Sequence, residues 1–220
     1  MYRGVLWNVF LAVLPVLFAG VLTALCEGFR KKGKSCPWFL WLPPGLLWFV
    51  FLPNACYLVT EWRHFLFQGF PYALHNYAGR DALIAIAKGS LFFLLYSLTG
   101  SLCFALAIRP VERLVRKAGG KPLLWAVPFF FLISLGVYLG LFIRLNSWNI
   151  VTHPSAVLAI TVHTLRDPQL FTAIVVFGFL LFLLYEALDI FLDGLGLRLT
   201  RSGLHLPFLS TDRPSRGSAA

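Results

Sequence analysis

The sequence predicts an all-α membrane protein, a polytopic bundle of five transmembrane helices with a short interfacial helix on the outer face. Of its 220 residues, 59% are hydrophobic and only 13% are charged. A soluble domain has about 25% charged residues, because water must wet its surface. Five apolar runs are long enough to cross a bilayer core of about 30 Å, which takes roughly 20 residues of helix. Lipid must therefore cover most of the surface of this chain.

The expected spans follow one another with short polar gaps between them. They cover residues 5–25, 43–63, 82–108, 123–145 and 170–192, within a transmembrane domain of residues 1–202. The first run is longer than the apolar region of a signal peptide and no small-residue cleavage site follows it, so we expect a permanent anchor. Residues 203–220 are rich in Ser, Pro and Arg, which predicts a disordered cytoplasmic tail.

The second span is the least regular of the five, because it contains three prolines. Pro43 and Pro44 suit the start of a helix, where a missing N–H donor costs nothing. Pro53 lies midway and should kink the helix. A neighbouring helix or a polar side chain must then satisfy the carbonyl that the proline frees.

The distribution of Lys and Arg predicts that the N-terminus is outside and the C-terminus is in the cytoplasm. The first gap, the third gap and the tail hold thirteen basic residues, whereas the N-terminus and the other two gaps hold five. The positive-inside rule places the basic gaps in the cytoplasm. These residues form no basic stripe with exposed aromatics, so the net charge of +10 does not indicate nucleic-acid binding. We expect membrane lipids, and as a further candidate another membrane protein, as partners, and no nucleic acid.

A stripe of polar residues climbs the outer half of the second span. Asn54, Tyr57, Glu61 and His64 are spaced i, i+3, i+7 and i+10, so they share one helical face. Ionisable residues within a membrane are expensive and usually functional. The Glu61 and His64 pair has the i, i+3 spacing of metal ligands in helical bundles. The alternative is a helix end at which Glu61 caps or pairs with a nearby arginine.

Two other segments bring polar residues to the same predicted face. Asp81, at the start of the third span, is either a helix N-cap or part of a site. The fourth span ends in a run of hydrogen-bond donors from Arg144 to Asn149. Arg144 either holds a carboxylate or phosphate in its planar fork or pairs with Glu61 or Asp81 to tie helices together. Residues 152–165 then begin Thr-His-Pro and carry a mixed stripe, which predicts the short interfacial helix.

Acidic residues gather at the inner end of the fifth span. Glu186, Asp189 and Asp193 are spaced i, i+3 and i+7, and we expect them to pair with the basic inner loops. Between Thr172 and Tyr185 there is no ionisable residue. A proton path through the membrane is therefore not indicated, and a transporter is the least favoured class of function.

Two stretches carry a motif pair. Residues 51–64 read FLPNACYLVTEWRH, and residues 144–149 read RLNSWN. Together they resemble the bacterial membrane family known as domain of unknown function 1361, whose pattern is approximately L-P-N-x-x-Y-x-x-T-D-x-x-H followed by R-x-N-S-W-D. The resemblance implies a multi-pass protein of the bacterial cytoplasmic membrane. It marks as site residues Pro53, Asn54, Tyr57, Thr60, Glu61, His64, Arg144, Asn146, Ser147 and Trp148.

The chain departs from this pattern at two positions. Glu61 stands where the family usually has Asp, which keeps the charge but lengthens the reach of the side chain. Asn149 also stands where Asp is usual, which removes a charge and half of the acceptor capacity. The resemblance itself implies no reaction.

We expect both motifs to meet at a shallow outward-facing site, with Asp81 as a third wall. The polar and aromatic side chains of the two motifs can form hydrogen bonds and stack, and binding needs no nucleophile. We therefore favour binding of a lipid headgroup, a small ligand or a partner protein. The ligand-binding candidates are Asn54, Tyr57, Thr60, Arg144, Asn146, Ser147, Trp148 and Asn149.

The alternative is a metal-assisted hydrolase or transferase that acts on a lipid-linked substrate at the outer face. Glu61 and His64 would then be metal ligands or the catalytic acid and base, and Asp81 is a further catalytic candidate. The sequence has no cofactor motif, and its four cysteines lack zinc-ligand spacing, so a divalent metal at Glu61 and His64 is the one cofactor considered. From the sequence alone, the choice between enzyme and binding protein stays open.

Overall fold

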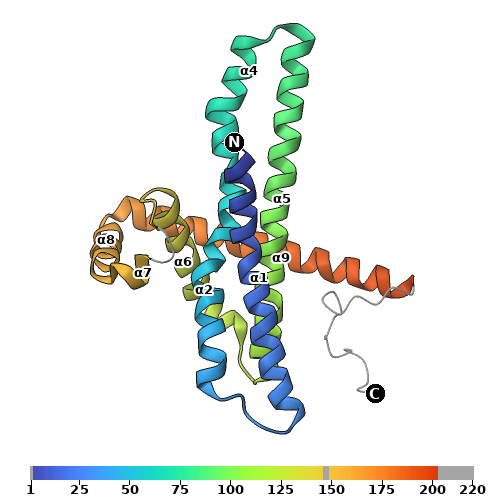
Figure 1. Cartoon of the computed structure of the whole chain (residues 1–220), viewed down its shortest axis with the longest axis vertical. Coiled ribbons are helices and arrows are strands. Elements are labelled where there is room, and N and C mark those ends of the chain that lie inside the picture. Colours follow the sequence, from blue (N-terminus) through green and yellow to red (C-terminus); the bar gives the residue numbers. More distant parts are fainter. Residues whose placement is uncertain (1, 146–148, 203–220) are drawn as a thin grey trace.

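In the residues that the structure describes, all regular secondary structure is helical, and five helices are long and apolar enough to cross a membrane (Figure 1). A computed structural model describes residues 2–145 and 149–202. The candidate spans are Gly4–Lys31, Trp38–Asn76, Gly79–Lys117, Leu124–Leu141 and Pro168–Arg201. The prediction of an all-α protein with five apolar spans is confirmed. The N-out orientation stays a prediction, and the predicted disordered tail, residues 203–220, lies outside the described residues.

The long helices are α1 (Tyr2–Lys31), α2 (Trp38–Thr60), α5 (Gly79–Lys117), α6 (Pro122–Leu141) and α9 (Pro168–Arg201). Three short segments continue the path of α2, namely α3 (Trp62–His64), the π-helical turn η1 (Phe65–Gly69) and α4 (Phe70–Asn76). Two more helices, α7 (Asn149–Thr152) and α8 (Pro154–Arg166), lie between α6 and α9.

Helices α1, α2 and α5 pack against one another and run together along the long axis of the molecule (Figure 1). Their contact depends on small residues. A Cβ atom on Gly100 of α5 would lie 2.5 Å from Cβ of Leu58 and 2.7 Å from the carbonyl oxygen of Ala55. The absence of a side chain at Gly100 therefore lets the backbones of α2 and α5 approach closely, which is how membrane helices gain packing contacts.

The helical path of α2 is longer than expected at both ends. It begins at Trp38, so Pro43 and Pro44 lie inside the helix rather than at its start. It then continues beyond the expected end near residue 63 as far as Asn76. The π-helical turn at Phe65–Gly69 comes just before Pro71. A wider turn relieves the clash between a proline ring and the carbonyl of the preceding turn, so the helix does not have to end there.

Helices α6 and α9 form a second pair, and α9 runs across the α1–α2–α5 group (Figure 1). The Ser134 hydroxyl of α6 donates a hydrogen bond of 2.7 Å to the buried carbonyl of Ile174 in α9. Stacking joins this pair to the first group, because the rings of Trp48 in α2 and Phe129 in α6 lie 5.8 Å apart and nearly parallel. The molecule is thus built from a three-helix group and a two-helix pair.

The short helix predicted after the fourth span is present as α8 and begins with Pro154 in its first turn. Asp167 follows it and caps α9, since its carboxylate accepts hydrogen bonds from the backbone N–H groups of Gln169 at 2.9 Å and Leu170 at 3.3 Å. The location of α8 at a membrane surface stays a prediction.

Candidate functional site

The polar stripe of α2 begins with side chains whose donors are satisfied within the helix. Asn54 is buried and donates to the carbonyl of Phe51 at 3.0 Å. The Thr60 hydroxyl donates to the carbonyl of Tyr57 at 2.8 Å. Both bonds lie within the stretch of α2 that contains Pro53 and Tyr57 and contacts α6. Asn54 and Thr60 thus help to stabilise the helical backbone of α2 at that contact.

Tyr57 carries the stripe across to α6. Its hydroxyl donates to the carbonyl of Gly136 at 3.3 Å. A Cβ on Gly136 would lie 2.8 Å from Cγ of Pro53, and a Cβ on Gly140 would lie 1.6 Å from the Tyr57 hydroxyl oxygen. Glycine at positions 136 and 140 thus creates the groove that receives Pro53 and Tyr57, two of the family-motif residues of α2.

The charged residues of the first motif follow at the end of α2 and in α3. Nε2 of His64 lies 3.8 Å from Oε2 of Glu61. His64 is exposed, whereas Glu61 is half-buried. The guanidinium carbon of Arg63 lies 5.7 Å from the centre of the Phe142 ring, which is a cation–π contact with the residue that ends α6. The end of the first motif therefore lies beside the start of the second.

Arg144 has an unusual backbone conformation. Its φ of 60° makes it the one non-glycine residue with positive φ in the described part of the chain. The backbone N–H of Leu145 donates to the carbonyl of Leu139 at 3.1 Å and closes the end of α6 around it. Glycine or asparagine is usual at such a position, because an L side chain in the left-handed region costs about 1–2 kcal/mol. The Arg144 side chain is exposed.

The structure brings part of the predicted site together and leaves Asp81 apart. The contacts of Tyr57 and Arg63 with α6 place residues 51–64 beside the segment that leads to Arg144. Asn149 begins α7, whereas the predicted site residues Asn146, Ser147 and Trp148 lie outside the described residues.

Asp81 is exposed in the first turn of α5, whose N-cap is Ala78. The ring of Trp62, the chain neighbour of Glu61, lies 6.2 Å from the ring of Phe93 in α5. Asp81 precedes Phe93 by twelve residues, which correspond to about 18 Å of helix. Within the structure, Asp81 therefore lies outside the group formed by the two motifs.

Glu61 and His64 offer two metal ligands and no more. Across residues 2–145 and 149–202, no three His, Cys, Asp or Glu side chains lie close enough together to hold a metal ion. A structural zinc site takes four ligands, and a catalytic one takes three from the protein. The described part of the chain supports a metal at Glu61 and His64 only if water, the substrate or another kind of side chain completes the set.

A second polar cluster joins α5 to α9. Arg109 is buried, its Nε lies 2.7 Å from Oδ1 of Asp189, and its Nη2 also pairs with Asp193. The expectation that the acidic residues of the fifth span pair with basic residues is confirmed for Asp189 and Asp193. A buried guanidinium needs such partners, because an unpaired charge in an apolar interior is strongly destabilising.

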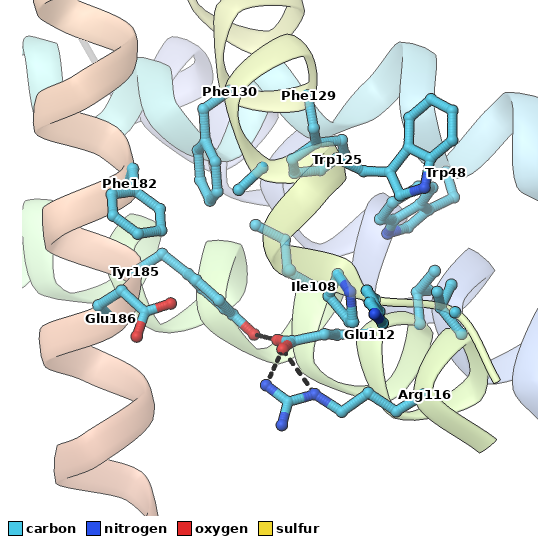
Figure 2. A pocket seen from close by; sticks show the side chains of 16 residues that line it. Trp48, Ile108, Glu112, Arg116, Trp125, Phe129, Phe130, Phe182, Tyr185 and Glu186 are labelled. Atoms are coloured by element: carbon cyan, nitrogen blue, oxygen red, sulfur yellow. Dashed lines mark hydrogen bonds and ion pairs between the residues drawn. The ribbon is translucent and has the colours of Figure 1, made fainter.

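A cavity with a volume of about 960 Å³ opens beside this cluster, between α5, α6 and α9. Figure 2 shows aromatic rings on one side of it and a chain of polar contacts on the other. In that chain, Glu112 accepts hydrogen bonds from the Tyr185 hydroxyl and from Arg116. Glu186 lines the cavity beside Tyr185.

Sequence reasoning missed this cavity. The helical spacing of Arg109, Glu112 and Arg116 signals a polar face on α5, but the aromatic residues opposite them read as an ordinary apolar span. Only the packing of α6 and α9 against α5 brings the two together.

Comparison with known proteins gives one match. The model of the family described as "Protein of unknown function (DUF1361)" matches residues 7–184, which include both motif stretches. No curated protein and no solved structure matches the chain.

Proposed function

The chain belongs to the DUF1361 family, and on that premise we propose that it is a multi-pass membrane protein that binds a phosphate-bearing ligand, foremost a lipid headgroup, where its two motifs meet. The backbone of Arg144 is the observation that carries this proposal. Residues held in sparsely populated backbone conformations cluster at functional sites, where the strain is part of the mechanism. In the DUF1361 motif, an arginine occupies a position at which glycine would fit without strain.

The chemistry around Arg144 favours an anion. The planar guanidinium of arginine matches phosphate and carboxylate with two parallel hydrogen bonds. Arg63 of α3 contacts the ring of Phe142 at the end of α6, and the exposed His64 is its chain neighbour. Glu61 supplies a negative charge, but it faces His64 at 3.8 Å. Basic groups thus outnumber acidic groups beside Arg144.

The kind of polar groups beside Arg144 favours binding over metal-assisted hydrolysis. The polar groups beside Arg144 are donors and cations rather than a nucleophile with an adjacent base. The enzymatic alternative depends on Glu61 and His64 as the start of a metal site. Stoichiometric zinc, iron or manganese in purified protein, lost in both Glu61→Gln and His64→Ala, would replace the binding proposal with that alternative.

The binding test uses detergent-purified protein titrated with short-chain phosphatidylglycerol and, in a parallel series, with inorganic phosphate. A hydrogen bond to a charged group contributes about 1.5–3 kcal/mol, so Arg144→Gln should weaken lipid binding roughly 10- to 100-fold. Arg144→Lys, which keeps the charge but loses the fork, should fall between Arg144→Gln and the wild type.

Arg80→Gln is the matched control, because Arg80 is an exposed arginine in the first turn of α5, away from the motifs. Equal affinity of the wild type and Arg144→Gln would refute the proposal. Binding of inorganic phosphate as tightly as of the lipid would identify a soluble phosphate compound, rather than a headgroup, as the ligand.

A further inference from the structure

The cavity between α5, α6 and α9 is well suited to an amphipathic molecule. Its volume of about 960 Å³ is that of a ligand site rather than a packing defect. Trp125, Phe129, Phe130 and Phe182 form an aromatic wall, and Glu112, Arg116 and Glu186 supply charges (Figure 2). Lys121 also lines the cavity. Trp125 is 69% exposed at the edge of this wall. Because Trp125 belongs to a candidate membrane span, the molecule that reaches it is a lipid.

The positive side of the cavity has unused hydrogen-bonding capacity. Arg116 binds Glu112 through Nε at 3.0 Å and through Nη2, which leaves its other N–H groups directed elsewhere. The side chain of Lys121, on the connection between α5 and α6, forms no hydrogen bond or ion pair with the residues that the structure describes. Two cations are thus available to a phosphate.

The negative side has one carboxylate without a direct partner. Both oxygens of Glu112 accept hydrogen bonds, one from Arg116 and one from Tyr185. The Glu186 carboxylate is exposed and makes no hydrogen bond or ion pair with any described residue, although Glu112, Asp189 and Arg116 act on it electrostatically. Two neighbouring carboxylates and nearby aromatic rings favour a cation, in particular an ammonium group, beside Glu186.

We infer that this cavity is a second binding site, which takes a zwitterionic phospholipid with an amine headgroup. The ammonium group lies at Glu186, the phosphate lies between Arg116 and Lys121, and the acyl chains pack against the aromatic wall. An anionic lipid satisfies the two cations equally well, but it leaves Glu186 without a positive partner. Glu186 is therefore the residue that sets the preference for one headgroup over the other.

The test compares short-chain phosphatidylethanolamine and phosphatidylglycerol, offered at equal concentration to detergent-purified protein and counted by native mass spectrometry. The Arg144→Gln background removes the contribution proposed for the motif site, so the two proposals fail separately. We expect a roughly fivefold preference for phosphatidylethanolamine, the size of effect that one partly exposed ion pair produces. Glu186→Gln should reduce the preference to about one, in line with the loss of that pair.

Two further variants distinguish a site from a general effect of charge. Asp81→Asn makes the same change of charge at an exposed position far from the cavity and should keep the preference. Lys121→Gln should weaken the binding of both lipids and leave their ratio unchanged. Because Lys121 and Glu186 are exposed, these variants should fold, which circular dichroism confirms.

An unchanged preference in Glu186→Gln, or equal binding of the two lipids by the wild type, would overturn the inference. Glycerophosphoethanolamine, which has the headgroup without acyl chains, should not compete. If it competes as well as the lipid, the aromatic wall plays no part and the inference is also overturned.

Discussion

Arg144 combines a backbone that opposes folding with a side chain that makes no contribution to the core. Its left-handed φ of 60° comes shortly after the end of α6, and its side chain is exposed. Stability alone would favour glycine there. If the guanidinium binds the proposed ligand, stability and binding should respond in opposite directions to substitution.

Arg144→Gly should raise the thermal unfolding midpoint and abolish binding. Relief of about 1 kcal/mol of backbone strain corresponds to about 2–4 °C for a chain of this size. Arg144→Ala is the control, because alanine keeps the strain and removes the guanidinium, so it should lose binding without gaining stability. Thermal unfolding followed by circular dichroism checks this, and a Gly variant no more stable than the Ala variant contradicts the strain argument.

At this scale, helical spacing predicts a shared face for Asn54, Tyr57, Glu61 and His64, and that face stays a prediction. Spacing does not predict what each side chain contacts. Asn54 and Tyr57 donate to backbone carbonyls, which no spacing reveals, because the acceptor of Tyr57 belongs to a helix almost 80 residues away. The positive φ of Arg144 has no signal in its residue type either.

The contact between α2 and α6 depends on two glycines spaced by one helical turn. Gly136 faces Pro53, and Gly140 faces the ring of Tyr57. In a membrane, helices gain most of their association energy from such close packing, since lipid is as apolar as leucine. The first motif stretch can therefore pack against α6, because α6 has no side chain where Tyr57 lies.

Gly140→Ala should destabilise the protein by about 1–3 kcal/mol, as overpacking of a tight contact usually does. The added Cβ would lie 1.6 Å from the Tyr57 hydroxyl oxygen and 2.5 Å from Cζ, so the ring must move. Gly20→Ala in α1 is the matched control, because a Cβ there has nothing within 4 Å, and it should be neutral or slightly stabilising. Thermal unfolding compares them, and equal midpoints would mean that α2 and α6 do not pack as described.

The sequence predicted the five long helices correctly as helices, but it did not predict how far α2 extends. Hydropathy detects the part of a helix that lies in lipid, so it located five apolar runs correctly. It gives no information about how far a helix continues outside them, and α2 with its continuation reaches Asn76 without a break that the sequence makes obvious. The accommodation of Pro71 by the turn Phe65–Gly69 depends on local geometry rather than on composition.

The whole molecule holds its two candidate sites at opposite ends of the contact between the three-helix group and the α6–α9 pair. Tyr57 marks one end, and the cavity beside Trp48 and Glu112 marks the other. The sequence did not reveal this division, because the order in which apolar helices pack leaves almost no trace in their hydropathy. Beside the cavity, the ion pairs of Arg109 in α5 with Asp189 and Asp193 in α9 join the three-helix group to the α6–α9 pair.

The length of two candidate spans bears on how the molecule lies in a bilayer. Trp38–Asn76 and Gly79–Lys117 have 39 residues each, which corresponds to about 58 Å of helix. A bilayer measures about 40–45 Å with its headgroups. One end of this helical pair must therefore reach beyond the membrane, or the pair must tilt strongly. Arg116 and Lys117 lie at the C-terminal end of α5, and their positive charges favour the cytoplasmic side for that end. The opposite end of the pair, at the turn Tyr77–Ala78, is therefore expected to project outside.

This orientation decides which compartment supplies the ligand of the Arg144 site, and labelling of single cysteines in intact bacterial cells tests it. In a background without the four native cysteines, Ala78→Cys should react with a membrane-impermeant maleimide in intact cells. Lys32→Cys and Ala118→Cys, in the two basic connections, should react only after permeabilisation. The reverse labelling pattern would mean that the membrane topology is inverted and that the Arg144 site faces the cytoplasm. The phosphate-bearing ligand would then be sought among cytoplasmic headgroups and metabolites, while the contacts proposed for it at Arg144 would be unchanged.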